Sequence, residues 1–194
     1  DLAADRRLAA ALTLAAEGEG GVIFLTGQPG IGKTRLAREA LALAKRRGFV
    51  VLEGRAYPLG VALAYAPLVD AFRPLLRNLD PIRLGDLVGD LPSLGYLFEG
   101  LRLPIPSFPL EGLGDPGLEK TRLFEGMSRL LERLTQEAPV ALFLDDLHWA
   151  DPATLELLHY LTRGLFGQQA LMVIAYPDGV LSASPGLQTL VECL

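Results

Sequence analysis

The apolar positions of the chain fall into short continuous runs and longer stretches with helical spacing. The continuous runs have the length of strands and cover residues 22–26, 49–53, 140–145 and 170–176. Between them, spacing of three and four residues predicts helices over 1–17, 35–47, 68–79, 118–137 and 152–165, with a weaker one from about 185. Apolar runs without alternation are typical of parallel strands covered by helices on both faces. The pattern therefore predicts an α/β domain with a mostly parallel sheet in a three-layer sandwich.

Individual residues define the buried faces and the ends of several helices. Leu8, Leu12 and Ala15 form one stripe of the first helix. The second helix is expected to bury a face made of Leu36, Ala37, Ala40, Leu41 and Ala44, and to end at Gly48. Asp151 followed by Pro152 is typical of a helix start, with Asp as the N-cap and Pro in the first helical position.

The stretch from about residue 80 to 117 has a different composition. It holds six of the fourteen prolines and seven glycines. This composition predicts short helices and turns that leave the main sheet without forming a second core. Two interpretations stay open: a solvated surface insertion, or an element that acts as a lid or contacts a partner. The whole chain, 1–194, is then one domain with an insertion.

A glycine-rich stretch connects the first strand to the second helix. It fits the pattern GxxxxGK(S/T), and the strand, loop and helix follow in the order that a phosphate-binding loop requires. The glycines allow the backbone to approach a ligand, and successive N–H groups together with the helix start favour an anion. The residues expected to bind nucleotide are Gly27, Gln28, Pro29, Gly30, Ile31, Gly32, Lys33, Thr34 and Arg35.

Chemical roles follow from the residue types. Lys33 is expected to reach the β- and γ-phosphates and to assist catalysis, and the Thr34 hydroxyl to bind Mg²⁺. The strand over 140–145 ends in Asp145 and Asp146, beside the expected loop. We expect Asp145 to hold Mg²⁺, through water, and Asp146 to orient or deprotonate the attacking water. Asp146 reaches that position only if the chain turns directly after Asp145.

Composition narrows the possible functions. The net charge is −5 and no basic block is present, which disfavours nucleic-acid binding by this portion. No stretch has the ~20 apolar residues of a membrane span, so no membrane association is expected. A single cysteine, Cys193, fits a reducing cytoplasm. We interpret His148 and Trp149 as structural residues, with His148 bonded to loop backbone and Trp149 filling a crevice. We interpret His159 as a helix-surface residue and Cys193 as an incidental buried or terminal thiol.

Three strings together resemble one group of ATPases. They are Gly-Gln-Pro-Gly-Ile-Gly-Lys-Thr-Arg-Leu at 27–36, Tyr-Ala-Pro-Leu at 65–68, and Leu-Asp-Asp-Leu-His-Trp-Ala-Asp at 144–151. The group comprises the STAND-type, AAA+-related domains of large ATP-binding LuxR-type regulators and of ATPase modules linked to nucleotide cyclases. The resemblance implies a switch that binds ATP or ADP with Mg²⁺ and responds to a protein partner or to self-association. It also implies a five-stranded parallel core, with the strands ending at 145 and 176 on one side of the loop strand.

The chain departs from this group in two places. The arginine that usually follows the fourth strand is missing from residues 175–178, which puts phosphate sensing in doubt. The chain also stops before a clear fifth strand, so we expect the outer edge of the loop strand to be unpaired or covered only by irregular chain.

The resulting hypotheses differ in chemistry. The first is a regulatory ATPase with slow turnover, and the alternative is a nucleotide-binding module for protein contact without significant hydrolysis. A small-molecule kinase is disfavoured because residues 80–117 offer only Arg83 and Arg102 for a lid. A DNA-loading AAA+ ATPase is disfavoured by the acidic balance.

Overall fold

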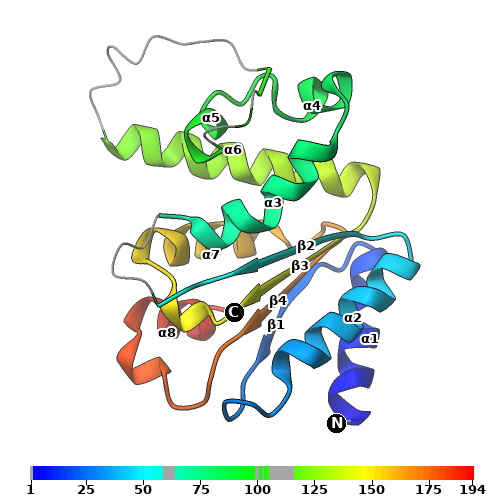
Figure 1. Ribbon diagram of the computed structural model, residues 1–194, viewed down its shortest axis with the longest axis vertical. Helices are drawn as coiled ribbons and strands as arrows, with labels where there is room; N and C mark the ends of the chain where they lie inside the picture. Colours follow the sequence, from blue (N-terminus) through cyan, green and yellow to red (C-terminus); the bar gives the residue numbers. More distant parts are fainter. Residues whose placement is uncertain (1, 59–63, 99–100, 102, 105–115) are drawn as a thin grey trace.

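A four-stranded parallel sheet forms the centre of the computed structural model, which describes residues 2–58, 64–98, 101, 103–104 and 116–194 (Figure 1). Its strands are β1 (Gly21–Leu25), β2 (Val50–Arg55), β3 (Val140–Asp145) and β4 (Ala170–Ala175). Their order across the sheet is β1-β4-β3-β2. All three pairings are parallel, as the continuous apolar runs predict. The α/β fold is confirmed, and each strand lies within two residues of its predicted range.

Helices connect the strands in the way that parallel strands require. They are α1 (Leu2–Ala16), α2 (Lys33–Arg46), α3 (Ala66–Asn78), α4 (Pro81–Val88), α5 (Leu94–Leu97), α6 (Pro116–Glu137), α7 (Pro152–Gly164) and α8 (Pro185–Glu192). Two short 3₁₀ helices, η1 (Leu147–Trp149) and η2 (Leu181–Ala183), follow β3 and β4. The predicted N-cap at Asp151 is confirmed, because its side chain accepts a hydrogen bond from the Thr154 amide.

Each face of the sheet carries its own hydrophobic core. On β3, Ala141 and Phe143 pack with α1 and α2, whereas Leu142 and Leu144 pack with the helices of the opposite face. The stripe Leu8, Leu12 and Ala15 is buried in the first core, as predicted. Every residue of β3 and β4 is buried. The result is a three-layer sandwich with α1 and α2 on one side of the sheet and α3, α6, α7 and α8 on the other (Figure 1).

The register of the sheet aligns the carboxyl ends of its strands. Arg55 at the end of β2 pairs with Asp145 at the end of β3, and Leu25 at the end of β1 pairs with Ala175 of β4. Residues that follow these positions therefore meet at one edge of the sheet. Within the described ranges no fifth strand pairs with β1, which lies at the edge of the sheet as expected.

The segment between α3 and α6 is more deeply buried than its composition suggests. Leu87, Val88, Leu91, Leu94, Leu97 and Phe98 are buried and join the same core as β3 and β4. The expectation of a solvated surface insertion is therefore wrong for residues 87–98. Their apolar side chains recur at helical spacing and therefore lie on one face. Through this face α4 and α5 pack against α6. Residues 105–115 of the expected insertion lie outside the described part.

Candidate functional site

The loop between β1 and α2 has the backbone conformation that its glycines allow. Gly27, Gly30 and Gly32 have φ values of 151°, 80° and 103°. Side-chain-bearing residues rarely adopt such angles, so the glycines are needed for the path of the chain. Gly32 then serves as the N-cap of α2.

The amides in the first turn of α2 find no acceptor among the described residues. The first amide of this helix seen to donate to the backbone is that of Leu36, which bonds to Gly32 O at 2.9 Å. No side chain caps the helix. Within the described residues, the N–H groups of Lys33, Thr34 and Arg35 therefore have no backbone or side-chain acceptor. Such amides at the positive end of a helix form a ready site for an anion.

The ammonium group of Lys33 lies over the loop itself. Its Nζ donates to Gly27 O at 2.8 Å and to Gln28 O at 3.1 Å. Both acceptors are carbonyls of the glycine-rich loop, so the charge is held close to the amides of the helix start. The loop thus already places a cation where a phosphate group would bind.

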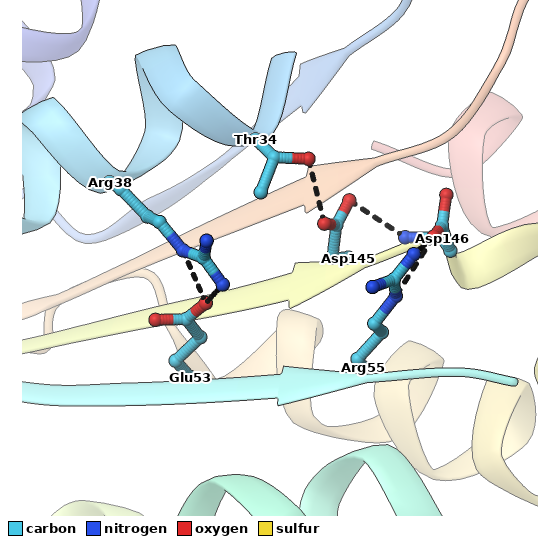
Figure 2. A network of polar contacts seen from close by, with 6 residues as sticks. All are labelled: Thr34, Arg38, Glu53, Arg55, Asp145 and Asp146. Atoms are coloured by element: carbon cyan, nitrogen blue, oxygen red, sulfur yellow. Dashed lines mark hydrogen bonds and ion pairs between the residues drawn. The ribbon is translucent and has the colours of Figure 1, made fainter. Parts of the chain in front are cut away.

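Thr34 and Asp145 bring the two halves of the site together (Figure 2). Thr34 Oγ1 donates to Asp145 Oδ2 at 2.8 Å, although the residues are 111 positions apart in sequence. The other carboxylate oxygen, Oδ1, accepts from the Asp146 amide at 3.0 Å. Asp145 is only 6% exposed. The sequence predicts this proximity, and in the structure the two side chains are in contact.

Asp146 lies on a sharp turn and is held by an arginine. Its φ of 52° is in the left-handed region, so the chain does turn directly after Asp145. Arg55 Nη2 and Nε donate to Asp146 Oδ2 at 2.5 and 3.0 Å. The hydrogen bond and charge of Asp146 raise the pKa of the Arg55 guanidinium. Figure 2 shows that β2 supplies Arg55 and the end of β3 supplies Asp146.

These groups surround a cavity of about 780 Å³. It is lined by Pro29, Gly30, Gly32, Lys33, Thr34, Arg35, Arg38, Glu39, Ala42, Arg55, Asp145, Asp146 and Pro177. Six of the nine expected nucleotide-binding residues are in this lining, together with both aspartates. Gly27, Gln28 and Ile31 are not. The cavity size suits a small-molecule ligand.

Three arginines line the cavity, and each is paired with a carboxylate. Arg35 contacts Glu39, Arg38 contacts Glu53, and Arg55 contacts Asp146. Neither Arg38 nor Arg55 is among the residues predicted from the sequence to lie in the site. The predicted second strand ends at Glu53, because Gly54 and Arg55 interrupt the apolar run. Extending that strand by two residues would have placed Arg55 at the same edge of the sheet as Asp145.

The residues after Asp146 differ from their expected roles. His148 Nδ1 is buried and has no hydrogen-bond partner within the described residues, so the expected bond from this atom to loop backbone is absent. Burial lowers the pKa of His148, Lys33 adds to this effect, and Asp146 opposes it. Trp149 is 48% exposed and does not fill a crevice. Its ring centroid lies 4.8 Å from that of His148.

The oxygen atoms of Thr34 and Asp145 suit Mg²⁺ better than they suit a metal ion whose ligands all come from the protein. In the part of the chain that the structure describes, no group of three or more His, Cys, Asp or Glu side chains is placed to hold a metal. Thr34 and Asp145 offer one hydroxyl and one carboxylate. Mg²⁺ is usually bound through one or two protein oxygens, with phosphates and water completing its shell. The residues therefore fit a magnesium ion that arrives with a phosphate ligand.

The sequence matches the family model of the AAA ATPase domain over residues 3–174. This match covers most of the chain, including the loop, α2 and the end of β3. The chain belongs to the AAA ATPase family. Membership of this family supports nucleotide binding, and its members generally bind ATP with Mg²⁺.

A second comparison finds a similar protein of uncharacterized function. It is an uncharacterized protein of Rhizobium meliloti (strain 1021), 27% identical over 184 residues. The alignment covers 86% of this chain but only 16% of that protein. The chain therefore spans about one sixth of the length of this relative. Separately, none of the described helices is both long enough and apolar enough to cross a membrane.

In this AAA domain the segment after β4 carries no arginine. Tyr176 is buried there and packs edge-on against Phe24, with ring centroids 6.2 Å apart. Asp178 N donates to Gly27 O, which ties the segment to the phosphate loop. Of the remaining candidates, His159 is partly buried on α7 and Cys193 is exposed and unpaired near the end of the described chain.

Proposed function

We propose that this chain is a regulatory ATPase module that binds Mg-ATP and hydrolyses it slowly. Nucleotide state would act as a signalling switch. The observation that carries the proposal is the 2.8 Å contact between Thr34 and Asp145. It joins the phosphate loop to the carboxylate of a neighbouring strand, as a site for a metal-bound triphosphate requires.

Different residues of the site would bind the phosphates and the metal ion. The amides of Lys33, Thr34 and Arg35, with the Lys33 ammonium, would accept the phosphate charge. Thr34 and Asp145 would hold Mg²⁺, which neutralises phosphate charge when bound. Asp145 is buried. A cation beside it, in place of the hydrogen of the Thr34 hydroxyl, would therefore stabilise its negative charge.

Asp146 is the residue we assign to hydrolysis. The turn at φ 52° directs its carboxylate to the cavity, where it would orient the attacking water or accept its proton. Both hydrogen bonds from Arg55 fall on Oδ2, so Oδ1 has no described side-chain partner. The guanidinium occupies Oδ2, one of the two carboxylate oxygens that could orient a water. This contact supports slow rather than rapid turnover.

A binding-only module is the second candidate. It is favoured by the same Arg55–Asp146 pair and by the absence of an arginine after β4, since both limit stabilisation of the reacting phosphate. In that case nucleotide would stabilise the fold for protein contact. The two candidates share the binding site and differ only in whether Asp146 acts.

Single-turnover hydrolysis separates these candidates. We expect labelled ATP, mixed with excess protein, to release phosphate slowly, and Asp146→Asn to lower that rate about 100-fold or more. ATP affinity, measured by calorimetry, should stay within about threefold in this variant. Asp86→Asn, an exposed aspartate on α4, is the control and should behave as the wild type. Tight binding without any phosphate release would support the binding-only module, and no binding would contradict both.

The finer functional class rests on the resemblance of the motifs. We place the module in a transcriptional regulator of the LuxR type with a STAND-type switch, acting in the cytoplasm through a protein partner or self-association. Direct contact with nucleic acid by this portion is not part of the proposal. Light scattering with ATP, with ADP and without nucleotide tests the assembly: a change in mass that depends on nucleotide supports it.

A further inference from the structure

Two chain segments leave the sheet at the site and meet again behind it. One follows Arg55 and leads to the start of α3, and the other follows Asp146 and leads to the start of α7. At the sheet they are joined by the Arg55–Asp146 ion pair. At the helices they are joined again, through the backbone of Tyr65 and the side chains of Asp151 and Thr154.

The second junction is a compact group of hydrogen bonds. The Tyr65 amide donates to Thr154 Oγ1 at 2.9 Å and to Asp151 Oδ2 at 3.3 Å. Thr154 Oγ1 in turn donates to Asp151 Oδ2. Thr154 is fully buried, so its hydroxyl exchanges no hydrogen bond with water. Removing the hydroxyl would leave the Tyr65 amide with only its longer bond.

These contacts go beyond what capping of α7 needs. The cap itself is made by Asp151 Oδ1, which accepts from the Thr154 amide at 3.0 Å. The cap does not use Asp151 Oδ2 or the Thr154 hydroxyl, and both of these oxygens accept a hydrogen bond from the Tyr65 amide. The side chains therefore link α3 to α7 in addition to starting α7.

Unfavourable backbone conformations lie at both junctions. Among the described residues, Tyr65 and Asp146 are the two non-glycine residues with positive φ, at 66° and 52°. Such conformations are unfavourable for residues with a side chain and persist only where their surroundings hold them. Tyr65 is held by Asp151 and Thr154, and Asp146 by Arg55. Loosening the junction at Tyr65 should thus allow the turn to relax at the end that Arg55 does not hold.

We propose that Thr154, with Asp151, is a positioning residue for Asp146. By fixing the Tyr65 amide, the two side chains anchor the far end of the turn over 146–151 and so keep the Asp146 carboxylate directed to the cavity. This inference rests on the proposed function, because the positioned group is the one assigned to hydrolysis. It also gives a physical reason for the string at 65–68 and the string at 144–151 to occur together.

A matched pair of substitutions isolates the hydroxyl. Thr154→Val keeps the shape of the side chain and removes the acceptor for Tyr65, whereas Thr154→Ser keeps the acceptor. We expect Thr154→Val to lower the single-turnover rate about tenfold, because a displaced catalytic group loses alignment. ATP affinity should change less than about twofold, since the phosphate loop is untouched. Thr154→Ser should restore the wild-type rate.

A measurement without nucleotide reports on the same junction. Trp149 is the single tryptophan of the chain and lies within the turn, half exposed, so its fluorescence quenching by acrylamide reports on the turn. Hydrogen exchange of a peptide containing Tyr65 reports on the start of α3. In Thr154→Val we expect stronger quenching and faster exchange, with both restored in Thr154→Ser.

The outcomes distinguish this inference from the proposed function. If wild type releases no phosphate, the proposed hydrolysis fails, and the quenching and exchange alone decide the junction. If Thr154→Val keeps the wild-type rate, quenching and exchange, the positioning role is overturned. Should Thr154→Val fail to fold, Asp151→Ser replaces it, because a serine still caps α7 but lacks the oxygen that faces Tyr65. If Asp151→Ser has the wild-type rate, quenching and exchange, the positioning role is likewise overturned.

Discussion

The phosphate loop and the turn after β3 face one cavity but are built in opposite ways. In the loop, the amides of the first turn of α2 have no acceptor among the described residues, and Lys33 contacts only loop carbonyls. In the turn, every carboxylate is partnered. Asp145 accepts from Thr34, Asp146 accepts from Arg55, and Asp151 accepts from Thr154 and Tyr65.

This difference separates binding from chemistry. The loop offers unpartnered donors to an anion and needs no rearrangement to bind phosphate. The turn has to give up or rearrange existing contacts before its carboxylates serve a metal or a water. We therefore expect the affinity for nucleotide to depend on the loop and the rate of hydrolysis to depend on the turn.

Lys33→Ala should have the largest effect, because it removes the charge from the binding region. Charge-assisted hydrogen bonds are worth roughly 1.5–3 kcal/mol each, so loss of the ammonium should weaken ATP binding about 100-fold or more while the fold is kept. Calorimetry measures the affinity and circular dichroism the fold. Lys45→Ala, at the other end of α2, is the control. Unchanged affinity in Lys33→Ala would show that the loop is not the phosphate site.

Arg55→Ala tests the turn and should change the rate rather than the affinity. Without the guanidinium, Oδ2 of Asp146 is free to orient water while the junction at Tyr65 still holds the turn, so we expect single-turnover hydrolysis to rise about threefold to tenfold. Arg83→Ala, which breaks a distant pair with Glu137, is the control. A fall in rate would show that Arg55 assists the reaction instead of restraining Asp146.

His148→Gln should remove a pH dependence of stability that belongs to the turn. Burial and Lys33 lower the pKa of His148 below its usual 6.5, so the unfolded chain binds more protons than the folded one between the two values. Stability should be full above pH 6.5 and fall as the pH drops through the lowered pKa. Thermal unfolding from pH 7.5 to 5 measures it, with His159→Gln as control. If the pH dependence of thermal stability is the same in His148→Gln as in wild type, His148 is not its source.

Arg35→Ala should have the smallest effect on nucleotide binding, although the sequence predicts a role for this residue. Its side chain is 86% exposed and paired with Glu39, so its charge is screened and partly neutralised. We expect a change in ATP affinity below about twofold by calorimetry. A loss comparable to that of Lys33→Ala would place Arg35 in direct contact with phosphate.

The predictable part of the site is the part encoded by local sequence. Gly27, Gly30 and Gly32 determine the loop path, and the apolar run before Asp145 determines a buried strand. Both patterns act over fewer than about ten residues, and the parallel sheet then brings their carboxyl ends together. The contact of Thr34 with Asp145 could therefore be predicted without a structure.

The rest depends on contacts between distant segments. Arg55 pairs with a residue 91 positions away, and Thr154 with one 89 positions away, and neither partner is marked by spacing. The burial of residues 87–98 was missed because prolines and glycines around them suggested solvated turns. There the packing of Leu94 and Phe98 into the shared core outweighed local composition.

The central claim is that Thr34 and Asp145 form a metal site for a bound triphosphate. ATP affinity measured with Mg²⁺ and with EDTA tests it most directly, in wild type and in Thr34→Val and Asp145→Asn. We predict that Mg²⁺ strengthens binding about tenfold or more in wild type and that both variants lose most of this gain while binding ATP in EDTA as before. A gain from Mg²⁺ that is the same in wild type and both variants would contradict the account.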